Sequence, residues 1–562
     1  MTSKSLKKDI GKKLLDFYNN SALAEIARQY PINLDRVPGT KVIIVATRAP
    51  KSPMSGGMAP AVKQACEGYD YKYWYAFGMN EKPESTLKRV AKAAFNAYHN
   101  KTVPITAMDV EGFRVRQVIA DGQAWDLQYN RYSNRITWPL SHNLESYAKD
   151  MEADDSSGNW SANETIAKRI VQDLNGDPSV PIWIHDYHHL PLADTLRRLG
   201  VENPITYFHH IPLPTLETLA NRNESEQMHF KEMANALRSC DAVLFQTEEV
   251  AKRFYDIIGK EQPDSIPAYQ GHFIKSLKNP RGQCYVGHAP ISINTAKEME
   301  IAQTPELKTA TAIELDKKLV AENIFINFER CDYSKGILQR VKAFEQMMQD
   351  NPELRGKAQL VLGAEPTRGT IREYIDYAND VKAVVKRMNS NKDLLCDGQD
   401  PIIFSNENVD HEDVIRLMRN RKEGQRRIGL ITPHEDGMNL TAKEFAAAQD
   451  LSNAGPLVIS SGAGTAKELD LDGKGAIVYQ KIKNGHVEVL VSAMLEAIHM
   501  PQEEANERAR VMQEHLKEYD IQRWAKFHKD IFEKIKDGEF TAPSKKPGGS
   551  SDSIKKPALD IA

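Results

Sequence analysis

The chain of 562 residues is too long to bury a single core, so two large domains are expected. Its apolar fraction of 41% and charged fraction of 27% are ordinary for a globular protein, and a formal net charge of -3 gives no electrostatic case for nucleic acid or an anionic membrane as main partner. Five scattered cysteines without a CxxC pair, and no apolar segment fit for a membrane span or secretory signal, indicate a cytoplasmic protein without a disulfide framework or zinc cage.

The chain begins with a predicted amphipathic helical leader over residues 1–40, and the first buried strand follows at 41–47. Short apolar runs of the same kind recur, with helical stretches between many of them. These runs lie at 181–186, 205–210, 242–247, 323–329, 358–364, 401–406, 428–433, 456–461 and 475–480. The alternation predicts an α/β fold whose parallel sheets carry helices on both faces.

The alternation weakens between about 295 and 320, where the sequence is polar and helical. We expect the domain junction there, with an N-terminal Rossmann-like domain at 41–300 facing a C-terminal one at 318–515 across a cleft. The last residues, 541–562, are rich in Pro, Gly, Ser and Lys, which is typical of a disordered tail.

The first motif follows the first strand, where Arg48 leads into a Pro/Ser/Gly loop that ends in Gly56-Gly57. Paired glycines allow close backbone approach to a phosphate, although a flexible surface loop has the same pattern. Farther along, Tyr129 and Trp138 offer the aromatic wall that a sugar pocket uses, with a place in the core as the alternative.

Two histidine-rich segments, 183–191 and 207–214, lie where predicted parallel strands end, and open α/β sheets bind ligands at that edge. They contribute His185, Asp186, His188, His189, His209 and His210. Histidine and aspartate are common metal ligands, but the segments lack HExxH or another recognised ligand spacing, so we predict no catalytic metal.

In the second half, segment 327–345 follows a strand and opens a helix, with Arg330 and Lys335 in a turn that ends at Gly336. Such a loop directs backbone N–H groups and the helix dipole at the cleft, so an arginine fork and a lysine point charge there would receive a diphosphate. Two solvated surface cations are the alternative. Arg368 follows the next strand.

Segment 431–449 also lies between a strand and a helix, and it presents groups suited to sugar hydroxyls. These are Asp436, Gly437, Met438 and Asn439. Glu444 falls on the first turns of the helix, where a carboxylate can accept hydrogen bonds from both ribose hydroxyls. An Asp/Asn helix cap without a ligand is the alternative interpretation.

Together these segments resemble the trehalose-6-phosphate synthase family of retaining glycosyltransferases, from about residue 41 to 535. The motifs that carry the resemblance occur in the family's order: ATR, SGG, YNxxSNxxTWP, WIHDYHHLP, FHHIPLP, LFQTEE, ERCDYSKG, PTRG and EDGMNLTAKE. The resemblance implies a GT-B fold, with the active site between two Rossmann-like domains and a C-terminal helix at 516–538 that crosses back to the first domain.

The resemblance also implies residue roles. Arg330 and Lys335 would hold the donor diphosphate and stabilise its developing charge, and Glu444 would bind the ribose. Catalytic roles at the donor sugar are implied for Asp186, His210 and Asp436, and contacts to the donor for Gly57, Gly437, Met438, Asn439 and Leu440. The acceptor pocket would comprise Arg48, Tyr129, Trp138 and Arg368, with both arginines on the acceptor phosphate. In the family the acceptor attacks on the same face that the leaving group departs from, and the leaving phosphate takes the acceptor's proton. The resemblance therefore implies no protein nucleophile, metal or cofactor.

The sequence departs from the family's usual pattern near the acceptor, with Phe77 where a tryptophan is usual and Ser292 in place of a glycine. Retention of Arg368 favours glucose-6-phosphate as acceptor, with UDP-glucose or another nucleotide-glucose as donor and trehalose-6-phosphate as product. Glycerol-3-phosphate, the acceptor of glucosylglycerol-phosphate synthase, is the alternative. A silent sugar-phosphate sensor and a metal hydrolase are two further hypotheses. We expect a separate phosphatase downstream and leave the oligomeric state, including a homo-oligomer, open.

Overall fold

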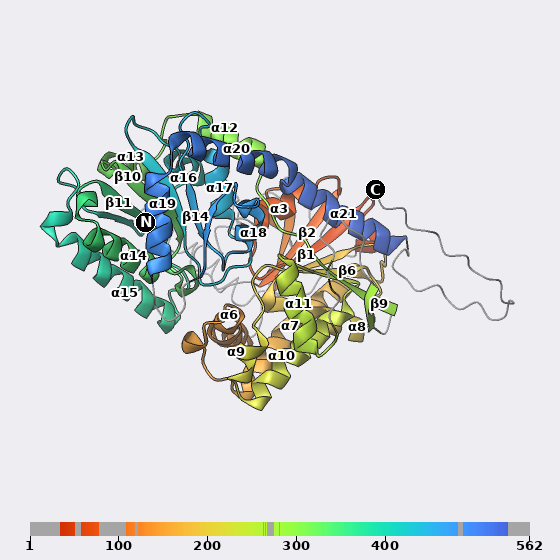
Figure 1. The fold of residues 1–562 in the computed structure, drawn as a ribbon. Coiled ribbons are helices and arrows are strands. Elements are labelled where there is room, and N and C mark those ends of the chain that lie inside the picture. The colour runs from red at the N-terminus through yellow and green to blue at the C-terminus, as the bar shows by residue number, and fades with distance from the viewer. Residues whose placement is uncertain are drawn as a thin grey trace, which may run out of the picture.

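The computed structural model describes residues 34–50, 58–77, 108–118, 122–261, 264, 266, 275–279, 282–481 and 487–537. Two sheets, each covered by helices, form two domains that lie side by side (Figure 1). The predicted α/β class with two parallel-sheet domains is confirmed. Most of the predicted leader, the predicted tail and Gly57 lie outside the described residues.

The sheet of the first domain has the strand order β3-β4-β2-β1-β5-β6-β7-β9-β8 in the described part of the chain. The bounds are β1 Lys41–Val45, β2 Tyr71–Phe77, β3 Met108–Val110, β4 Phe113–Val118, β5 Ile182–His185, β6 Ile205–His209, β7 Ala242–Phe245, β8 Lys275–Asn279 and β9 Gly282–His288. The strands between the two edges are parallel, and β3 and β8 pair antiparallel at the edges. Strands β1, β5, β6 and β7 are buried throughout, as their apolar runs predicted.

Helices cover both faces of this sheet. Their bounds are η1 Leu34–Arg36, α3 Met58–Ala65, α5 Gly122–Trp125, η2 Asp126–Thr137, α6 Trp138–Ser141, η3 Glu145–Tyr147, α7 Ala153–Leu174, η4 Tyr187–His189, α8 Leu192–Arg198, α9 Leu216–Ala220, α10 Glu224–Ala236, η5 Leu237–Ser239 and α11 Glu248–Ile258. The segment η2 is a π-helix, a rare conformation that is frequent at functional sites.

The sheet of the second domain is parallel throughout, in the order β12-β11-β10-β13-β14-β15. The bounds are β10 Asn323–Arg330, β11 Ala358–Glu365, β12 Ile402–Ser405, β13 Arg426–Ile431, β14 Leu457–Ser460 and β15 Ile477–Tyr479. Counted from its own first strand, this is the doubly wound order of a Rossmann fold.

The helices of the second domain begin before its first strand. Their bounds are α12 Thr295–Gln303, α13 Ala310–Lys318, η6 Tyr333–Lys335, α14 Ile337–Asp350, η7 Pro352–Leu354, α15 Arg372–Asn389, η8 Lys392–Leu394, α16 His411–Met418, α17 Leu440–Ala448, α18 Gly464–Asp470, α19 Glu488–His499 and α20 Gln502–Glu518. Helix α12 packs against α16 and α17, and Ile301 and Ala302 join the core of this domain. The chain therefore leaves the first sheet before Thr295.

The last described helix, α21 (Ile521–Lys536), returns to the first domain (Figure 1). Helix α20 packs on α17, whereas α21 packs on α3. Trp524 of α21 is fully buried, with its ring centroid 5.5 Å from that of Trp183 and its Nε1 donating to the carbonyl of Ala289 at 3.2 Å. Trp524, together with Ile531 and Phe532, thus anchors this helix on the first sheet.

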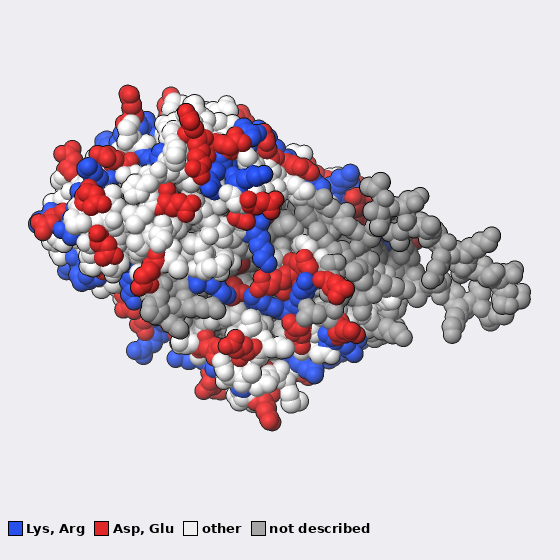
Figure 2. Space-filling model, in the orientation of Figure 1, with Lys and Arg blue, Asp and Glu red and all other residues white. Residues whose placement is uncertain are grey.

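Charges of both signs are interspersed over the described surface of the face shown in Figure 2, in agreement with the near-zero net charge. Within the described residues, no helix combines the length and apolar character needed to cross a membrane.

Candidate active site

The sites predicted in the two halves lie at corresponding points of the two sheets. Strand β1 lies between β2 and β5, and β10 lies between β11 and β13, so the strand order reverses at β1 and at β10. Open α/β sheets bind ligands beyond the carboxyl ends of their strands at such a point. Arg48 and Asp186 follow β1 and β5, and Lys335 and Asp436 follow β10 and β13.

Asp186 has an unusual backbone, with φ 72° and ψ 165°. This region is almost restricted to glycine, and a non-glycine residue there costs on the order of 1–3 kcal/mol. The surroundings hold it in place, because its N–H donates to the Phe208 carbonyl at 2.9 Å and its Oδ1 accepts from the His210 N–H at 3.3 Å. Burial raises the pKa of Asp186 to about 6, against the opposing effects of backbone hydrogen bonds and of Arg368 and Arg330.

His210 contacts both domains. Its Nε2 lies 3.1 Å from Nδ1 of His185, and burial lowers the pKa of His210 to about 3, so the ring is neutral. A Cβ placed on Gly437 would lie 1.9 Å from the His210 carbonyl oxygen. Glycine at 437 therefore lets the domains touch directly behind the site. Among the described residues, no three His, Cys, Asp or Glu side chains are grouped so as to hold a metal ion.

Lys335 and Asp436 form an ion pair at the end of the second sheet, with Nζ 2.5 Å from Oδ2. Lys335 ends η6, which Asp332 caps, and Gly336 follows at φ 67° with the Thr432 carbonyl too close for any Cβ. Burial would raise the pKa of Asp436, but Lys335 lowers it below its ordinary value overall, so the carboxyl is ionised.

The loop from Asp436 into α17 is fixed by its own backbone and by the next loop. Asn439 has φ 80° and caps α17, accepting from the Ala442 N–H at 3.2 Å. The Met438 carbonyl accepts from the Thr465 N–H at 2.9 Å. Leu440 begins the helix, so the N–H groups of its first turn point to this end.

Glu444 lies one turn into α17 and is half-buried. Its neighbour Lys443 points elsewhere, fully buried against Glu468 at 2.7 Å. Burial raises the pKa of Glu444 to about 7, with His411 opposing and Glu298 adding to the rise.

Two guanidinium groups from the second domain lie over Trp138 of the first. The Arg368 group is 4.0 Å and the Arg330 group 5.5 Å from the ring centroid. The side chain of Arg330 is 43% exposed, whereas the side chain of Arg368 is 6% exposed. The Arg368 guanidinium donates to the Tyr187 hydroxyl at 3.1 Å. Arg330 is thus accessible to a ligand, and Arg368 is oriented by partners.

Arg48 is exposed and donates to the hydroxyl of Tyr129, a residue of the π-helix η2. The Tyr129 ring stacks on Trp125 and on His188, with centroids 4.7 and 5.8 Å apart. The pKa of His188 lies well below its ordinary value, mainly because the ring is buried. The charges of His189, Arg368 and Arg48 lower this pKa further. Both predicted acceptor arginines therefore act on the same imidazole, one from each domain.

Some residues of the site were not predicted from the sequence. Asp332 is buried and lies 3.4 Å from Arg368 and 3.9 Å from Arg330. Its place between Arg330 and Lys335 in ERCDYSK was the signal for it. Tyr187 stands next to Asp186 in the histidine-rich segment, but nothing local indicated that it would meet Arg368.

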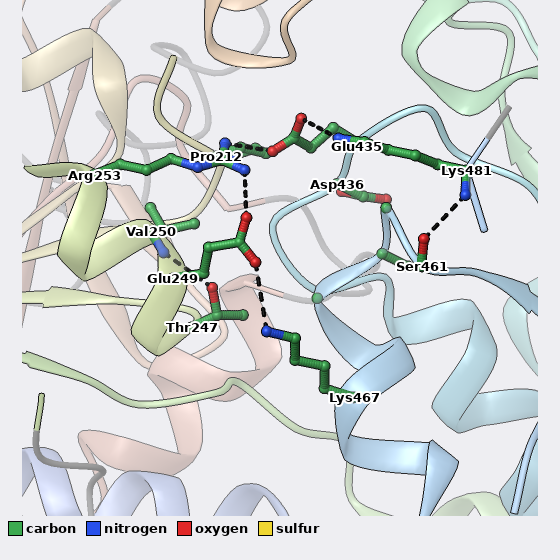
Figure 3. Close-up of a pocket in the computed structure, with 13 residues that line it drawn as sticks. Pro212, Thr247, Glu249, Val250, Arg253, Glu435, Asp436, Ser461, Lys467 and Lys481 are labelled. Atoms are coloured by element: carbon green, nitrogen blue, oxygen red, sulfur yellow. Dashed lines mark hydrogen bonds and ion pairs between the residues drawn. The ribbon is translucent and has the colours of Figure 1, made fainter. Parts of the chain in front are cut away.

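A pocket beside Asp436 is lined by both domains, and Figure 3 shows its charged residues. Glu435 pairs with Arg253 of α11, lies 3.3 Å from Lys481 and accepts from Asn143 at 2.6 Å. A second bridge joins Glu249 to Lys467 at 3.5 Å. Sequence reasoning missed Glu435, which connects the two domains.

The family model described as Glycosyltransferase family 20 matches residues 45–534. A trehalose-6-phosphate synthase of Sinorhizobium fredii is 29% identical over 497 residues, 87% of this chain and 97% of the relative. One of Cronobacter sakazakii is 32% identical over 413 residues, 73% of this chain and 80% of the relative.

Solved structures are similar over the same part of the chain. An E. coli trehalose-6-phosphate structure bound with UDP-2-fluoro glucose has a TM-score of 0.71 at 25% identity, covering 88% of this chain and 99% of its own. A UDP-forming α,α-trehalose-phosphate synthase of Burkholderia xenovorans in complex with glucose-6-phosphate has the same TM-score and identity, covering 88% and 100%.

Proposed function

The chain belongs to glycosyltransferase family 20, and we propose on this basis that it transfers glucose from a nucleotide-glucose to glucose-6-phosphate with retention of configuration. The products are trehalose-6-phosphate and a nucleoside diphosphate. Solved relatives that hold UDP-2-fluoro glucose or glucose-6-phosphate support both substrate classes. Within this chain, the observation that carries the proposal is that Arg330 and Arg368 of the second domain lie over Trp138 of the first. The charges of both arginines also lower the pKa of Asp186.

In the proposed reaction, charge develops as the anomeric bond breaks, negative on the leaving diphosphate and positive on the sugar. Arg330 and Lys335 stabilise the diphosphate in a partly buried setting, where fixed charges act strongly. Lys335 carries three N–H donors, so it can serve the diphosphate while it keeps Asp436 at 2.5 Å. Asp436 in turn accepts from a donor-sugar hydroxyl.

The donor sugar also contacts His210 and Asp186 in this proposal, together with the backbone of Gly437, Met438, Asn439 and Leu440. The neutral His210 ring can donate one hydrogen bond without adding charge near the anomeric carbon. The acceptor hydroxyl attacks the anomeric carbon on the face that the diphosphate leaves, so no side chain acts as nucleophile. The leaving phosphate takes the proton of that hydroxyl, so no side chain is needed as base.

For the acceptor phosphate, Arg48 and Arg368 provide two forks from opposite domains. Arg368 keeps a set orientation because Tyr187, Tyr374 and Asp332 hold it. Arg48 is exposed and moves onto the phosphate from the Tyr129 hydroxyl. Tyr129 and Trp138 form the aromatic wall between them.

A substrate panel tests the proposal. Purified protein is assayed with UDP-, ADP- and GDP-glucose against glucose-6-phosphate and glycerol-3-phosphate, with and without excess chelator. We expect a disaccharide phosphate with glucose-6-phosphate, product retained in chelator, and loss of product in Lys335→Ala but not in Lys342→Ala, an exposed lysine of α14. Product with glycerol-3-phosphate but not with glucose-6-phosphate would overturn the proposed acceptor. Substrate binding without turnover would overturn the proposal that the protein is an enzyme.

We also propose a cytoplasmic location, no cofactor and a separate phosphatase downstream. All five cysteines are buried and free, which suits a reducing compartment. Release of inorganic phosphate from trehalose-6-phosphate by this chain alone would contradict the separate phosphatase.

A further inference from the structure

Three helices of the second domain bring three ionisable side chains together behind the donor site. Glu298 lies on α12, His411 begins α16 and Glu444 lies on α17, and these helices pack against one another. Nε2 of His411 lies 3.2 Å from both carboxylate oxygens of Glu298. Glu298 is buried, and 40% of the His411 side chain remains exposed.

Glu444 needs its charge for the role proposed above. An ionised carboxylate accepts hydrogen bonds from both hydroxyls of a ribose, and charge-assisted bonds are about twice as strong as neutral ones. Burial and Glu298 raise the pKa of Glu444 to about 7 even though the charge of His411 opposes the rise, so loss of that charge would raise the pKa further. Without a nearby positive charge, much of the protein would carry the weaker, protonated form.

His411 supplies that positive charge. Burial would lower its pKa, but the hydrogen bond to Glu298 and the charges of Glu444 and Glu298 raise it to about 9, against a small opposing effect of Lys297. The imidazole is therefore protonated at neutral pH. Its place on the first turn of α16 makes this notable, because a helix N-terminus disfavours cations.

We propose that His411, held in place by Glu298 across the packed helices α12, α16 and α17, is a positioning residue that supplies the counter-charge for the Glu444 carboxylate in its bonds to the donor ribose. The inference rests on the proposed role of Glu444 in the transferase. In this arrangement Glu444 touches the ribose, His411 supplies the counter-charge and Glu298 fixes the imidazole. A histidine that only ties α12 to α16 would stabilise the fold without distinguishing one donor from another.

The test compares His411→Gln, His411→Lys and the wild type with nucleotide-glucose and its 2′-deoxyribose analogue. His499→Gln, at an exposed histidine ending α19, is the matched control. We expect His411→Gln to raise donor KM about tenfold with kcat little changed, and His411→Lys to restore most of the affinity. With the 2′-deoxy donor the same substitution should change KM less than about twofold, because one of the ribose bonds is already absent.

The pH dependence adds a second signature. A carboxyl group with a raised pKa becomes negatively charged only at higher pH. Loss of the His411 charge raises the pKa of Glu444 further, so the carboxylate forms at a still higher pH. The ratio of variant to wild-type KM should therefore shrink as pH rises from 6.5 toward 9. Equal KM losses with ribose and deoxyribose donors, or a fall in thermal stability with unchanged KM, would overturn the inference.

Calorimetric binding of UDP and 2′-deoxy-UDP separates this inference from the proposed reaction. If wild type binds UDP more tightly and His411→Gln removes that preference, the inference stands even where no transfer is detected. If transfer occurs but the preference is the same in both proteins, only the role of His411 is overturned. Failure of the wild type to bind UDP, ADP or GDP, or any of their 2′-deoxy forms, overturns both.

Discussion

Where the domains meet, cationic side chains are already paired with carboxylates of the protein. Lys335 pairs with Asp436 at 2.5 Å, and Arg368 with Asp332 at 3.4 Å. Desolvated charges need such partners, because removing one leaves the other buried without compensation. A ligand diphosphate therefore meets cations whose positions are set before it arrives.

Lys335→Ala removes the cation and leaves the Asp436 carboxylate buried. We expect kcat to fall at least about 100-fold and stability to fall by about 3 kcal/mol. Adding Asp436→Asn should recover most of the stability but none of the activity. Urea unfolding midpoints and turnover of both variants check this, and an additive stability loss in the double variant would contradict it.

Asp186 gives a pH dependence of its own. Its pKa of about 6 means that the carboxylate is present above pH 6 and is lost as pH falls through that value. With saturating donor, which removes the contribution of Glu444, kcat should fall as pH drops from 7 to 5. Asp186→Asn should be slow at every pH and lack this acid limb. If kcat of Asp186→Asn falls at low pH in the same way as that of the wild type, the titrating group is not Asp186.

At the scale of elements, the site is built from strand ends and the loops that follow them. Gly336 and Gly437 each allow a close backbone approach. A Cβ built on Gly336 would lie 2.1 Å from the Thr432 carbonyl oxygen, and one built on Gly437 would lie 1.9 Å from the His210 carbonyl oxygen. Strands β2, β4 and β9 were not among the predicted apolar runs, because lysine, arginine and glutamine interrupt them.

Gly437→Ala tests the contact between elements of the two domains. The added methyl group must displace the His210 carbonyl, so the domains part and the donor loses contacts from both. We expect kcat/KM to fall about 10- to 100-fold with a smaller change in thermal midpoint. Gly369→Ala is the control, since a Cβ there meets no atom within 4 Å. Similar losses in both variants would contradict this account.

At the scale of the whole molecule, two kinds of connection join the domains. Helix α21 returns to the first sheet and buries Trp524 there, while Glu435 links Arg253 to Lys481 beside the site. The first is apolar and covered, and the second is a small charged network near the substrates. The second is therefore the more sensitive to changes in domain closure.

A comparison of two bridges tests which of them holds the domains. Arg253 and Glu435 are 11% and 7% exposed, whereas Glu249 and Lys467 are 54% and 81% exposed. A double-mutant cycle with Arg253→Met and Glu435→Gln should give a coupling of about 2–3 kcal/mol in stability. The cycle with Glu249→Gln and Lys467→Met should give less than about 1 kcal/mol. Equal couplings would show that burial does not matter here.

The sequence by itself determined the strands that are buried on both faces, because such strands must be apolar along their length. The family resemblance of its motifs also implied Arg330, Lys335 and Asp436 as one donor site, and residues that follow parallel strands do gather at the same edge of a sheet. Only the tertiary structure decided the pairs between distant segments, such as Arg253 with Glu435 and His411 with Glu298. Local patterns cannot encode such pairs, since each depends on how helices of separate segments pack.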